Sequence, residues 1–164
     1  MISPVLNSKA TNHLEIRTTP GKGSGVFTKK DFSAGEIVSV GTIEQVLKEN
    51  NAHAIQIGEN TFVLQNEISS MVNHSCSPNC GIHVNETGAH DYKAMRDIAT
   101  GEEITFDYAM QNYTIDYFPD QCQCGSNECR GSITGWKDLP ASKKTEYHGF
   151  IPAYLLELDK STSD

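Results

Sequence analysis

Three stretches of the sequence concentrate residue types that can do chemistry. Residues 73–80 place an amide, an imidazole, a hydroxyl, two thiols and a proline within eight positions. Residues 101–108 form a turn and an apolar strand that ends in Asp107 and Tyr108. Residues 122–131 contain three cysteines. Apolar residues flank the first stretch, so we expect a buried polar loop whose groups are all hydrogen-bonded.

The cysteines indicate a metal site. Three of the five, Cys122, Cys124 and Cys129, fall within eight residues. Cys122 and Cys124 are too close for an easy disulfide, whereas thiolates at this spacing can share a metal ion. Zinc takes four tetrahedral ligands with Zn–S distances of about 2.3 Å, and these three cysteines supply three of them. In a reducing compartment this pattern favours zinc over disulfides, and free buried thiols at all five positions are the weaker alternative.

A glycine-rich stretch, residues 21–25, precedes all of these. Glycine permits positive φ and a close approach of the backbone to a ligand. The stretch is not a dinucleotide fingerprint, because the third glycine and the βαβ unit are missing. Taken alone, it is more typical of a simple hairpin turn than of a ligand-binding loop.

In this order, the stretches resemble the SET-domain protein-lysine methyltransferases that carry a zinc-binding post-SET motif. Gly23-Ser24-Gly25-Val26-Phe27 matches the opening of that domain, residues 73–79 match its first signature, and residues 101–108 match its second. The resemblance covers about residues 14–136. It implies a mostly β protein with a small helical tail, namely the SET-domain (β-clip) fold with a C-terminal pseudoknot and a post-SET zinc segment.

The resemblance also implies a methyl donor, S-adenosyl-L-methionine, with S-adenosyl-L-homocysteine as its product. The backbone of the glycine loop would cradle the donor, the Asn73 side chain would hold its amino-acid end, and the His74 backbone would hold the adenine edge. Ile133 and Trp136 are our candidates to cover the adenine. The implied donor-binding residues are Lys22, Gly23, Ser24, Gly25, Asn73, His74, Tyr108, Ile133 and Trp136.

By the same resemblance, Tyr108 is the catalytic tyrosine. Phe106, two residues earlier on the last strand, should face the same side of the sheet and control product specificity. A phenylalanine there implies di- or trimethyllysine products. The resemblance also makes Cys76 the fourth ligand of one structural zinc, beside Cys122, Cys124 and Cys129, and leaves Cys80 over.

One departure from the family concerns the lysine channel. Many SET domains place a tyrosine shortly after the strand equivalent to residues 37–40, whereas this chain has Val40-Gly41-Thr42. The channel wall must therefore differ. Four aromatic residues could substitute: Phe62, Tyr113, Tyr117 and Phe118.

The elements that must position these residues are mainly strands. Alternation and apolar runs predict strands at 13–17 and 104–106 and a buried strand at 37–40. They also predict a hairpin of 54–57 with 61–64 and a strand pair of 82–84 with 91–96. Residues 43–50 fit a short helix or an irregular insert. Pro140 and Pro152 could each open a helix near the C-terminus. We expect four parts: an N-terminal extension (1–12), a SET domain (13–110), a post-SET zinc segment (111–136) and a helical extension (137–164).

Composition narrows the class of partner. The 164 residues include 13 Lys and Arg but 21 Asp and Glu, a formal charge of −8. This balance argues against direct binding of nucleic acid, and it suits either a basic protein substrate, such as a histone tail, or simple solubility. No apolar run is long enough for a signal peptide or a membrane span, so we expect a soluble intracellular protein.

The functional prediction is transfer of methyl groups to a lysine of a protein or peptide substrate. One alternative is a catalytically inactive, zinc-containing SET-like module that only binds peptides. A zinc-stabilised structural protein without a ligand is a second alternative. Nothing in the sequence indicates an oligomeric state.

Overall fold

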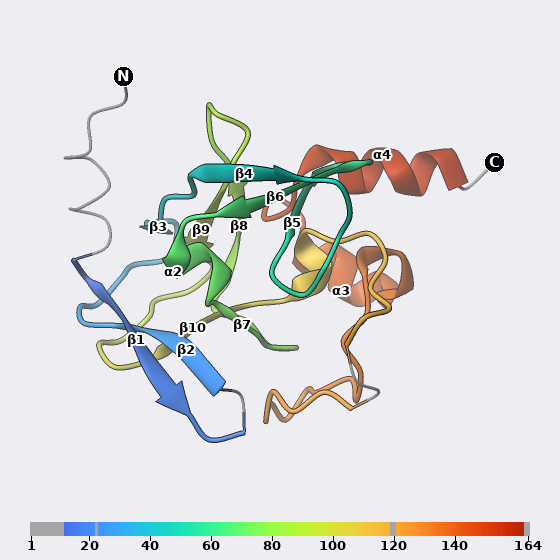
Figure 1. Ribbon diagram of the computed structural model, residues 1–164. Coiled ribbons are helices and arrows are strands. Elements are labelled where there is room, and N and C mark those ends of the chain that lie inside the picture. The colour runs from blue at the N-terminus through green and yellow to red at the C-terminus, as the bar shows by residue number, and fades with distance from the viewer. Residues whose placement is uncertain (1–11, 22, 119–120, 163–164) are drawn as a thin grey trace.

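The computed structural model describes residues 12–21, 23–118 and 121–162 (Figure 1). Three small sheets form most of it, and short helices follow towards the C-terminus. The predicted mostly β fold with a small helical tail is confirmed. Lys22 and residues 1–11 lie outside the described residues, and so does most of the predicted N-terminal extension.

The first sheet brings the glycine loop beside two of the predicted signatures. Its strands, in spatial order, are β1 (Leu14–Thr19), β2 (Gly23–Thr28), β10 (Glu103–Phe106) and β7 (Asn73–His74). Val26 on β2 pairs with Ile104 on β10, and both are fully buried. Burial of this apolar pair holds β10 in the centre of the sheet.

The second sheet consists of β3 (Ile37–Ser39), β9 (His90–Ala94) and β8 (Cys80–Val84). The predicted antiparallel pairing of β8 with β9 is confirmed. The prediction that residues 37–40 form a buried strand was wrong in part, because Ile37 and Val40 are 39% and 38% exposed. β3 lies at the edge of its sheet, and of these four residues Val38 and Ser39 are buried.

The third sheet consists of β4 (Ile43–Leu47), β6 (Thr61–Gln65) and β5 (Ile55–Gly58). The predicted hairpin of β5 and β6 is confirmed. The interpretation of residues 43–50 as a helix or irregular insert was wrong, because β4 pairs along β6. Pairing with an existing hairpin overrides the weak local preference of this polar segment. A one-turn helix that we did not predict, α2 (Glu67–Ser70), leads from this sheet to β7.

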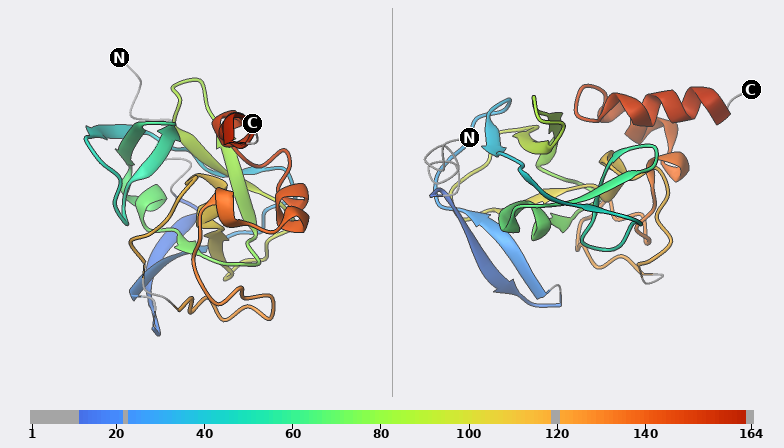
Figure 2. Two further views of the ribbon diagram at one scale, coloured as in Figure 1. Left: turned by 90° about the vertical axis from the view of Figure 1, so that its right-hand side faces the viewer. Right: turned by 45° about the horizontal axis from the view of Figure 1, so that its top comes forward.

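Two 3-10 turns and two helices complete the fold: η1 (Tyr108–Met110), η2 (Trp136–Asp138), α3 (Ala141–Glu146) and α4 (Ala153–Thr162). Both predicted C-terminal helices are present, and α4 lies across the molecule from the β1–β2 hairpin (Figures 1 and 2). Tyr147 and Leu155 are fully buried in the main hydrophobic core. The C-terminal extension is therefore part of the packed domain. No helix in the described ranges is long and apolar enough to cross a bilayer.

Residues 73–80 form hydrogen bonds with strand β10 from both ends of their loop. β7 runs parallel to β10, and the N–H of Ser75 donates to the carbonyl of Phe106 at 3.0 Å. Asn79 holds the strand from the other end of the loop: its amide donates to the Glu103 carbonyl at 2.8 Å, and its side-chain oxygen accepts from the Thr105 N–H at 2.9 Å. The expected polar loop is thus hydrogen-bonded to the second signature, as the predicted pseudoknot requires.

Candidate active site and metal centre

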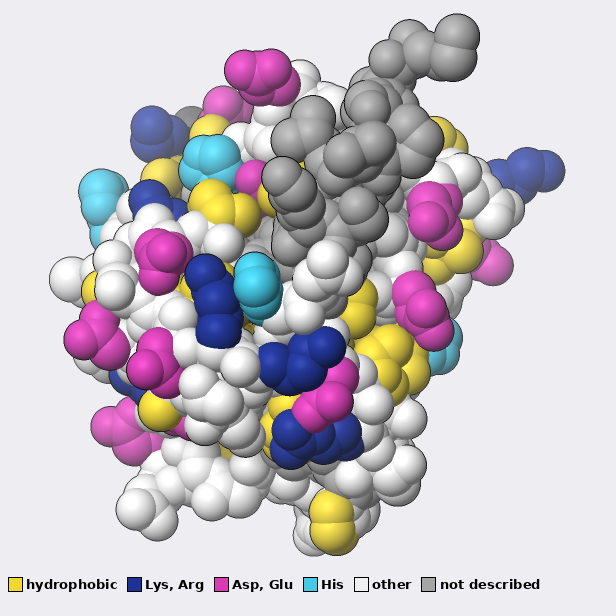
Figure 3. Space-filling view, turned by 90° about the vertical axis from the view of Figure 1, so that its left-hand side faces the viewer, with side chains coloured by type: hydrophobic (Ala, Val, Ile, Leu, Met, Phe, Trp, Pro, Cys, Tyr) yellow, Lys and Arg dark blue, Asp and Glu magenta, His cyan; other side chains and the backbone are white. Residues whose placement is uncertain are grey.

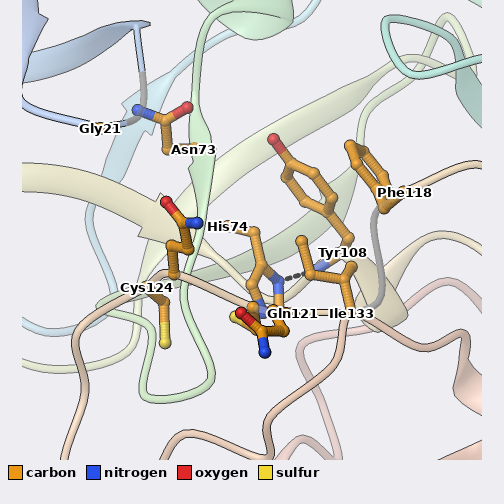
Figure 4. Close-up of a pocket in the computed structure, with 10 residues that line it drawn as sticks. Gly21, Asn73, His74, Tyr108, Phe118, Gln121, Cys124 and Ile133 are labelled. Atoms are coloured by element: carbon orange, nitrogen blue, oxygen red, sulfur yellow. Dashed lines mark hydrogen bonds between the residues drawn. The ribbon is translucent and has the colours of Figure 1, made fainter.

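A cavity of about 690 Å³ lies between the β1–β2 turn, β7, η1 and the cysteine-rich segment (Figure 4). Four predicted donor-binding residues line it: Asn73, His74, Tyr108 and Ile133. The remaining lining residues are Gly21, Phe118, Gln121, Cys122, Gln123 and Cys124. The fold therefore brings residues from four distant stretches of the sequence to one hollow.

The glycine loop contacts Asn73, one of the residues that line this cavity. The Asn73 side-chain N–H group donates to the Ser24 carbonyl at 2.9 Å and to the Glu103 carboxylate at 2.8 Å. A Cβ on Gly25 would collide with that carboxylate and lie 2.8 Å from the Asn73 amide nitrogen. A side chain at position 25 would therefore displace the Glu103 carboxylate and the Asn73 amide from their present contact. Gly23, Ser24 and Gly25 do not themselves line the cavity; Gly21 does.

The buried His74 ring links the cavity to the cysteines. Its Nδ1 accepts the backbone N–H of Tyr108 at 3.1 Å, and its Nε2 lies 3.4 Å from the Cys76 sulfur. An Nδ1 that accepts carries no proton, so Nε2 is the protonated nitrogen and donates to sulfur. The ring therefore has a structural role, joining Tyr108 to Cys76.

Tyr108 does not continue strand β10 as predicted, because the strand ends at Phe106 and Tyr108 begins η1. The two rings nevertheless touch, with centroids 5.0 Å apart. The Tyr108 hydroxyl donates to the Val72 carbonyl at 3.3 Å. Burial, and secondarily Tyr117, raises the pKa of Tyr108 to about 12, so its hydroxyl stays protonated at neutral pH.

A second, much narrower cavity, about 20 Å³, lies on the other side of Tyr108. Tyr108 and Phe118 line both cavities, so the two meet at these rings. Phe106 and Tyr117 also line the narrow one. The other lining residues are Ala52, His53, Ala54, Ile55, Ser69, Ser70, Val72, Tyr92, Gln111 and Asn112.

Part of the wall of the narrow cavity is aromatic. Of the four aromatic residues proposed as substitutes, Tyr117 and Phe118 lie in this wall, and their ring centroids are 5.0 Å apart. Phe62 and Tyr113 line a separate cavity and do not reach the narrow one. Burial raises the pKa of Tyr117 to about 12, so this wall is uncharged at neutral pH.

The four predicted zinc ligands come together. The sulfurs of Cys76, Cys122, Cys124 and Cys129 all lie within 4.8 Å of one another. Those of Cys76 and Cys122 are 3.9 Å apart, close to the sulfur–sulfur distance of about 3.8 Å that a tetrahedral zinc site with Zn–S near 2.3 Å requires. Cys80 is fully buried elsewhere in the core, and burial raises its pKa to about 12.

Backbone donors around the sulfurs suit thiolates. The N–H groups of Arg130 and Gly131 lie 3.4 Å from the Cys76 and Cys129 sulfurs. Burial opposes ionisation of Cys124, but backbone N–H groups outweigh it and lower its pKa to about 7; at Cys76 burial prevails and raises the pKa to about 11, and it likewise raises the pKa of Cys122. Such outer hydrogen bonds stabilise ligand charge and fix ligand orientation, so the donor set fits zinc.

Sequence reasoning missed a buried carboxylate beside Tyr108. Asp107 is fully buried and accepts four hydrogen bonds. They come from Arg130 Nη1 at 2.7 Å, Arg130 Nη2 at 3.0 Å, the Tyr147 hydroxyl at 2.8 Å and the Ala109 N–H at 3.1 Å. The Asp-Tyr pair and the arginine after Cys129 were visible in the sequence, but nothing showed that they meet.

Trp136 does not lie where we predicted. It is 1% exposed in the hydrophobic core, and its ring N–H donates to Asp159 on α4 at 2.8 Å. Trp136 therefore does not line the cavity of about 690 Å³ that four other donor-binding candidates line. Its large apolar ring is buried by the C-terminal helices, whose packing the sequence did not reveal. Ile133, three residues earlier, does line the cavity.

Comparison with known proteins is consistent with this geometry. The family described as "SET domain" matches residues 23–109. The H3 lysine-36 specific histone-lysine N-methyltransferase of Mycosarcoma maydis is 39% identical over 142 residues, which cover 74% of this chain and 14% of that protein. The variant-silencing SET domain-containing protein of Plasmodium falciparum is 33% identical over 141 residues, or 71% of this chain and 5% of that protein.

A solved structure shows the same fold. KRYPTONITE, crystallised with mCHG DNA and SAH, matches with a TM-score of 0.57 and 23% identity, over 73% of this chain and 28% of that one. This chain spans only a small part of the length of these relatives.

Proposed function

The chain belongs to the SET-domain family, and we propose that it transfers methyl groups from S-adenosyl-L-methionine to the side-chain amine of a lysine in a protein substrate. The observation that carries the proposal is the meeting of two cavities at Tyr108 and Phe118. The wide one has room for the donor, and the aromatic rings that line the narrow one would flank the lysine amine. Displacement at carbon needs the amine in line with the methyl–sulfur bond, and cavities that share two rings would bring amine and methyl group close together.

The narrow passage also favours the nucleophilic form of lysine. An unperturbed lysine has a pKa of about 10.4, so neutralising it at pH 7 costs on the order of 4–5 kcal/mol. The apolar rings of Phe106 and Phe118 exclude water from the ammonium, and the donor's sulfonium repels it, so both effects favour the neutral amine. The protonated Tyr108 hydroxyl then aligns the reacting groups and takes no proton from the amine.

In the wide cavity, Asn73, the His74 backbone and Ile133 would contact the donor. Asn73 is oriented by its bonds to Ser24 and Glu103, and Ile133 supplies an apolar surface for adenine. Gly21 is the glycine-loop residue that faces the cavity. A contact from Lys22 stays a prediction, because this residue lies outside the described ones.

We propose one structural zinc held by Cys76, Cys122, Cys124 and Cys129. Zinc would cross-link the segment after η1 to the loop that holds Cys76, and it would take no part in the transfer itself. Because Cys122 and Cys124 also line the donor cavity, this cross-link would order one of its walls.

The substrate class follows from the relatives and from charge. The relatives named above include an H3 lysine-36 specific enzyme, and KRYPTONITE has also been crystallised with an H3(1-15) peptide. We propose a basic protein segment, such as a histone tail, as the substrate of this acidic chain, which would place the reaction in the nucleus. On the face shown in Figure 3, Lys and Arg are interspersed with Asp and Glu, without the continuous basic stripe that nucleic-acid binding would need.

Two measurements on the purified protein test this function against the peptide-binding alternative. S-adenosyl-L-homocysteine should raise the unfolding temperature, because it binds only the folded state. Radiolabelled methyl from the donor should appear on lysine when the protein is incubated with a proteome, and site mapping would then name the target. Ligand stabilisation without any methyl transfer would favour the inactive module, and absence of both would favour a structural protein.

A further inference from the structure

The four donors to the Asp107 carboxylate come from three parts of the chain. Arg130 belongs to the cysteine-rich segment, Tyr147 follows α3 in the C-terminal extension, and Ala109 lies in η1 itself. A carboxylate has about four acceptor positions, so all of them are used. Burial of a fully bonded carboxylate costs less than burial of an unpaired one, but replacing it with apolar packing would cost less still. Its presence beside Tyr108 therefore invites a functional explanation.

We propose that Asp107 is a positioning residue for methyl transfer, held by Arg130 and Tyr147 so that it fixes the turn that carries Tyr108. The proposal rests on the proposed function. Asp107 is the N-cap of η1, and its Oδ1 accepts the N–H of Ala109 at 3.1 Å. Tyr108 lies between these two residues, and its own N–H is held by His74. Movement of the carboxylate would therefore move the tyrosine.

Arg130 ties this carboxylate to the cysteine cluster. Its guanidinium donates hydrogen bonds to both carboxylate oxygens of Asp107, and its backbone nitrogen lies 3.4 Å from the Cys76 sulfur. Arg130 thus connects the cysteine-rich segment to η1, so an ordered cysteine-rich segment helps to fix the position of η1. A planar fork on a carboxylate fixes direction as well as distance, which a lysine in this place would not do.

Tyr147 connects the C-terminal extension to the same Asp107 carboxylate. It is fully buried at the C-terminal end of α3, and its hydroxyl donates to Asp107 Oδ2 at 2.8 Å. Residues beyond 136 match no motif in the sequence, yet this hydroxyl holds the carboxylate next to the proposed catalytic tyrosine. The extension thereby supports the turn that carries Tyr108 without touching either cavity at this point.

The test compares Tyr147→Phe with a matched control, Tyr113→Phe. Each change removes one hydroxyl that donates to a carboxylate, and the Tyr113 hydroxyl donates to Asp159 at 3.2 Å, away from η1. We expect Tyr147→Phe to lower kcat per donor-binding site about tenfold or more, because small misplacements at the reacting centre are costly. Calorimetric titration with S-adenosyl-L-homocysteine counts the sites, and its Kd should change less than twofold. Tyr113→Phe should leave kcat per site within twofold of wild type.

If Tyr147 had a purely structural role, Tyr147→Phe would lower the number of donor-binding sites and leave kcat per site unchanged. That result for Tyr147→Phe, or an equal fall in Tyr113→Phe, would overturn the proposal. Arg130→Lys keeps the charge but loses the fork, and it should act in the same direction as Tyr147→Phe. If Tyr147→Phe does not fold, Arg130→Lys replaces it as the test variant.

A spectroscopic readout separates this proposal from the proposed function. The ring resonances of Tyr108, assigned by their loss in Tyr108→Phe, should shift or broaden in Tyr147→Phe and stay unchanged in Tyr113→Phe. A wild-type protein without methyl transfer would overturn the function, but the ring resonances would still report on the turn. Unchanged Tyr108 resonances in both Tyr147→Phe and Arg130→Lys would show that Asp107 does not position this residue.

Discussion

Tyr108 shows how the surroundings of one residue set its chemistry. Its hydroxyl is protonated at neutral pH, donates to the Val72 carbonyl and lies where the two cavities meet. A protonated phenol cannot act as a general base at that pH, so it contributes through alignment and hydrogen bonding. The substrate lysine would lose its proton before the transfer, because the narrow cavity and the donor's sulfonium lower the free-energy cost of the neutral amine.

Phe106 should decide how many methyl groups are added. It is 2% exposed, and its ring contacts both Tyr108 and Tyr92 at 5.0 Å between centroids. We expect wild-type protein to reach di- or trimethyllysine and Phe106→Tyr to stop mainly at mono- or dimethyllysine. The added hydroxyl can hold a water in the space that a methylated amine needs. Mass spectrometry of a peptide substrate at saturating donor measures this.

The first methyl transfer serves as the internal control for Phe106→Tyr, because it should proceed at a rate close to that of wild type. Wild-type protein that stalls at monomethyllysine would show that Phe106 does not control the outcome.

His90 should make the fold sensitive to acid. It is fully buried, and burial lowers its pKa to about 4, below the value of about 6.5 expected in an unfolded chain. Between these values the unfolded state binds the extra proton, so stability falls as pH drops from about 6.5 to 4, by on the order of 3 kcal/mol. Urea unfolding at pH 7 and at pH 4.5 should show a smaller acid loss in His90→Gln than in wild type. Equal losses in both proteins would contradict the assignment.

At the scale of elements, short segments do the positioning. β7, the turn η1 and the segment around Cys122 are each too short to be stable alone, and each is held by side-chain hydrogen bonds or sulfur contacts to the others. The wall of the donor cavity at Cys122 and Cys124 depends in particular on the cysteine cluster.

Removal of zinc should therefore act locally before it acts globally. Elemental analysis should find about one zinc per chain. A chelator should abolish S-adenosyl-L-homocysteine binding and raise hydrogen exchange in residues 121–136 while strands β8 and β9 stay protected. Exchange in β8 and β9 is the control. Simultaneous loss of protection in both regions, or a Cys122–Cys124 disulfide, would contradict this picture.

For the molecule as a whole, the sequence predicted more of the site than of the packing. The cysteine spacing indicated Cys122, Cys124 and Cys129 because metal ligation demands particular residue types at particular spacings, and the resemblance of the two signatures implied Asn73, Tyr108 and Cys76. Strand β4 was missed because its pairing with β6 is a tertiary contact that its own polar residues do not encode.

The C-terminal part shows the same limit. The sequence predicted both helices from their prolines, but it could not show that Trp136 turns towards Asp159 or that Tyr147 reaches Asp107. Such contacts join residues 23 and 40 positions apart, and they depend on how the helices dock against the core. Side-chain direction in an irregular segment has no period from which it could be predicted.

The most direct test of the account is methyl transfer by wild-type protein and by Tyr108→Phe under the same conditions. A histone mixture with labelled donor is the substrate, and mass spectrometry locates the methyl groups. We predict methyllysine with wild-type protein, and a fall in kcat of about 100-fold or more in Tyr108→Phe with the donor Kd changed less than about threefold, because the lost hydroxyl acts mainly in the transition state. Equal turnover by the two proteins would contradict the account, since Tyr108 is where its two cavities meet.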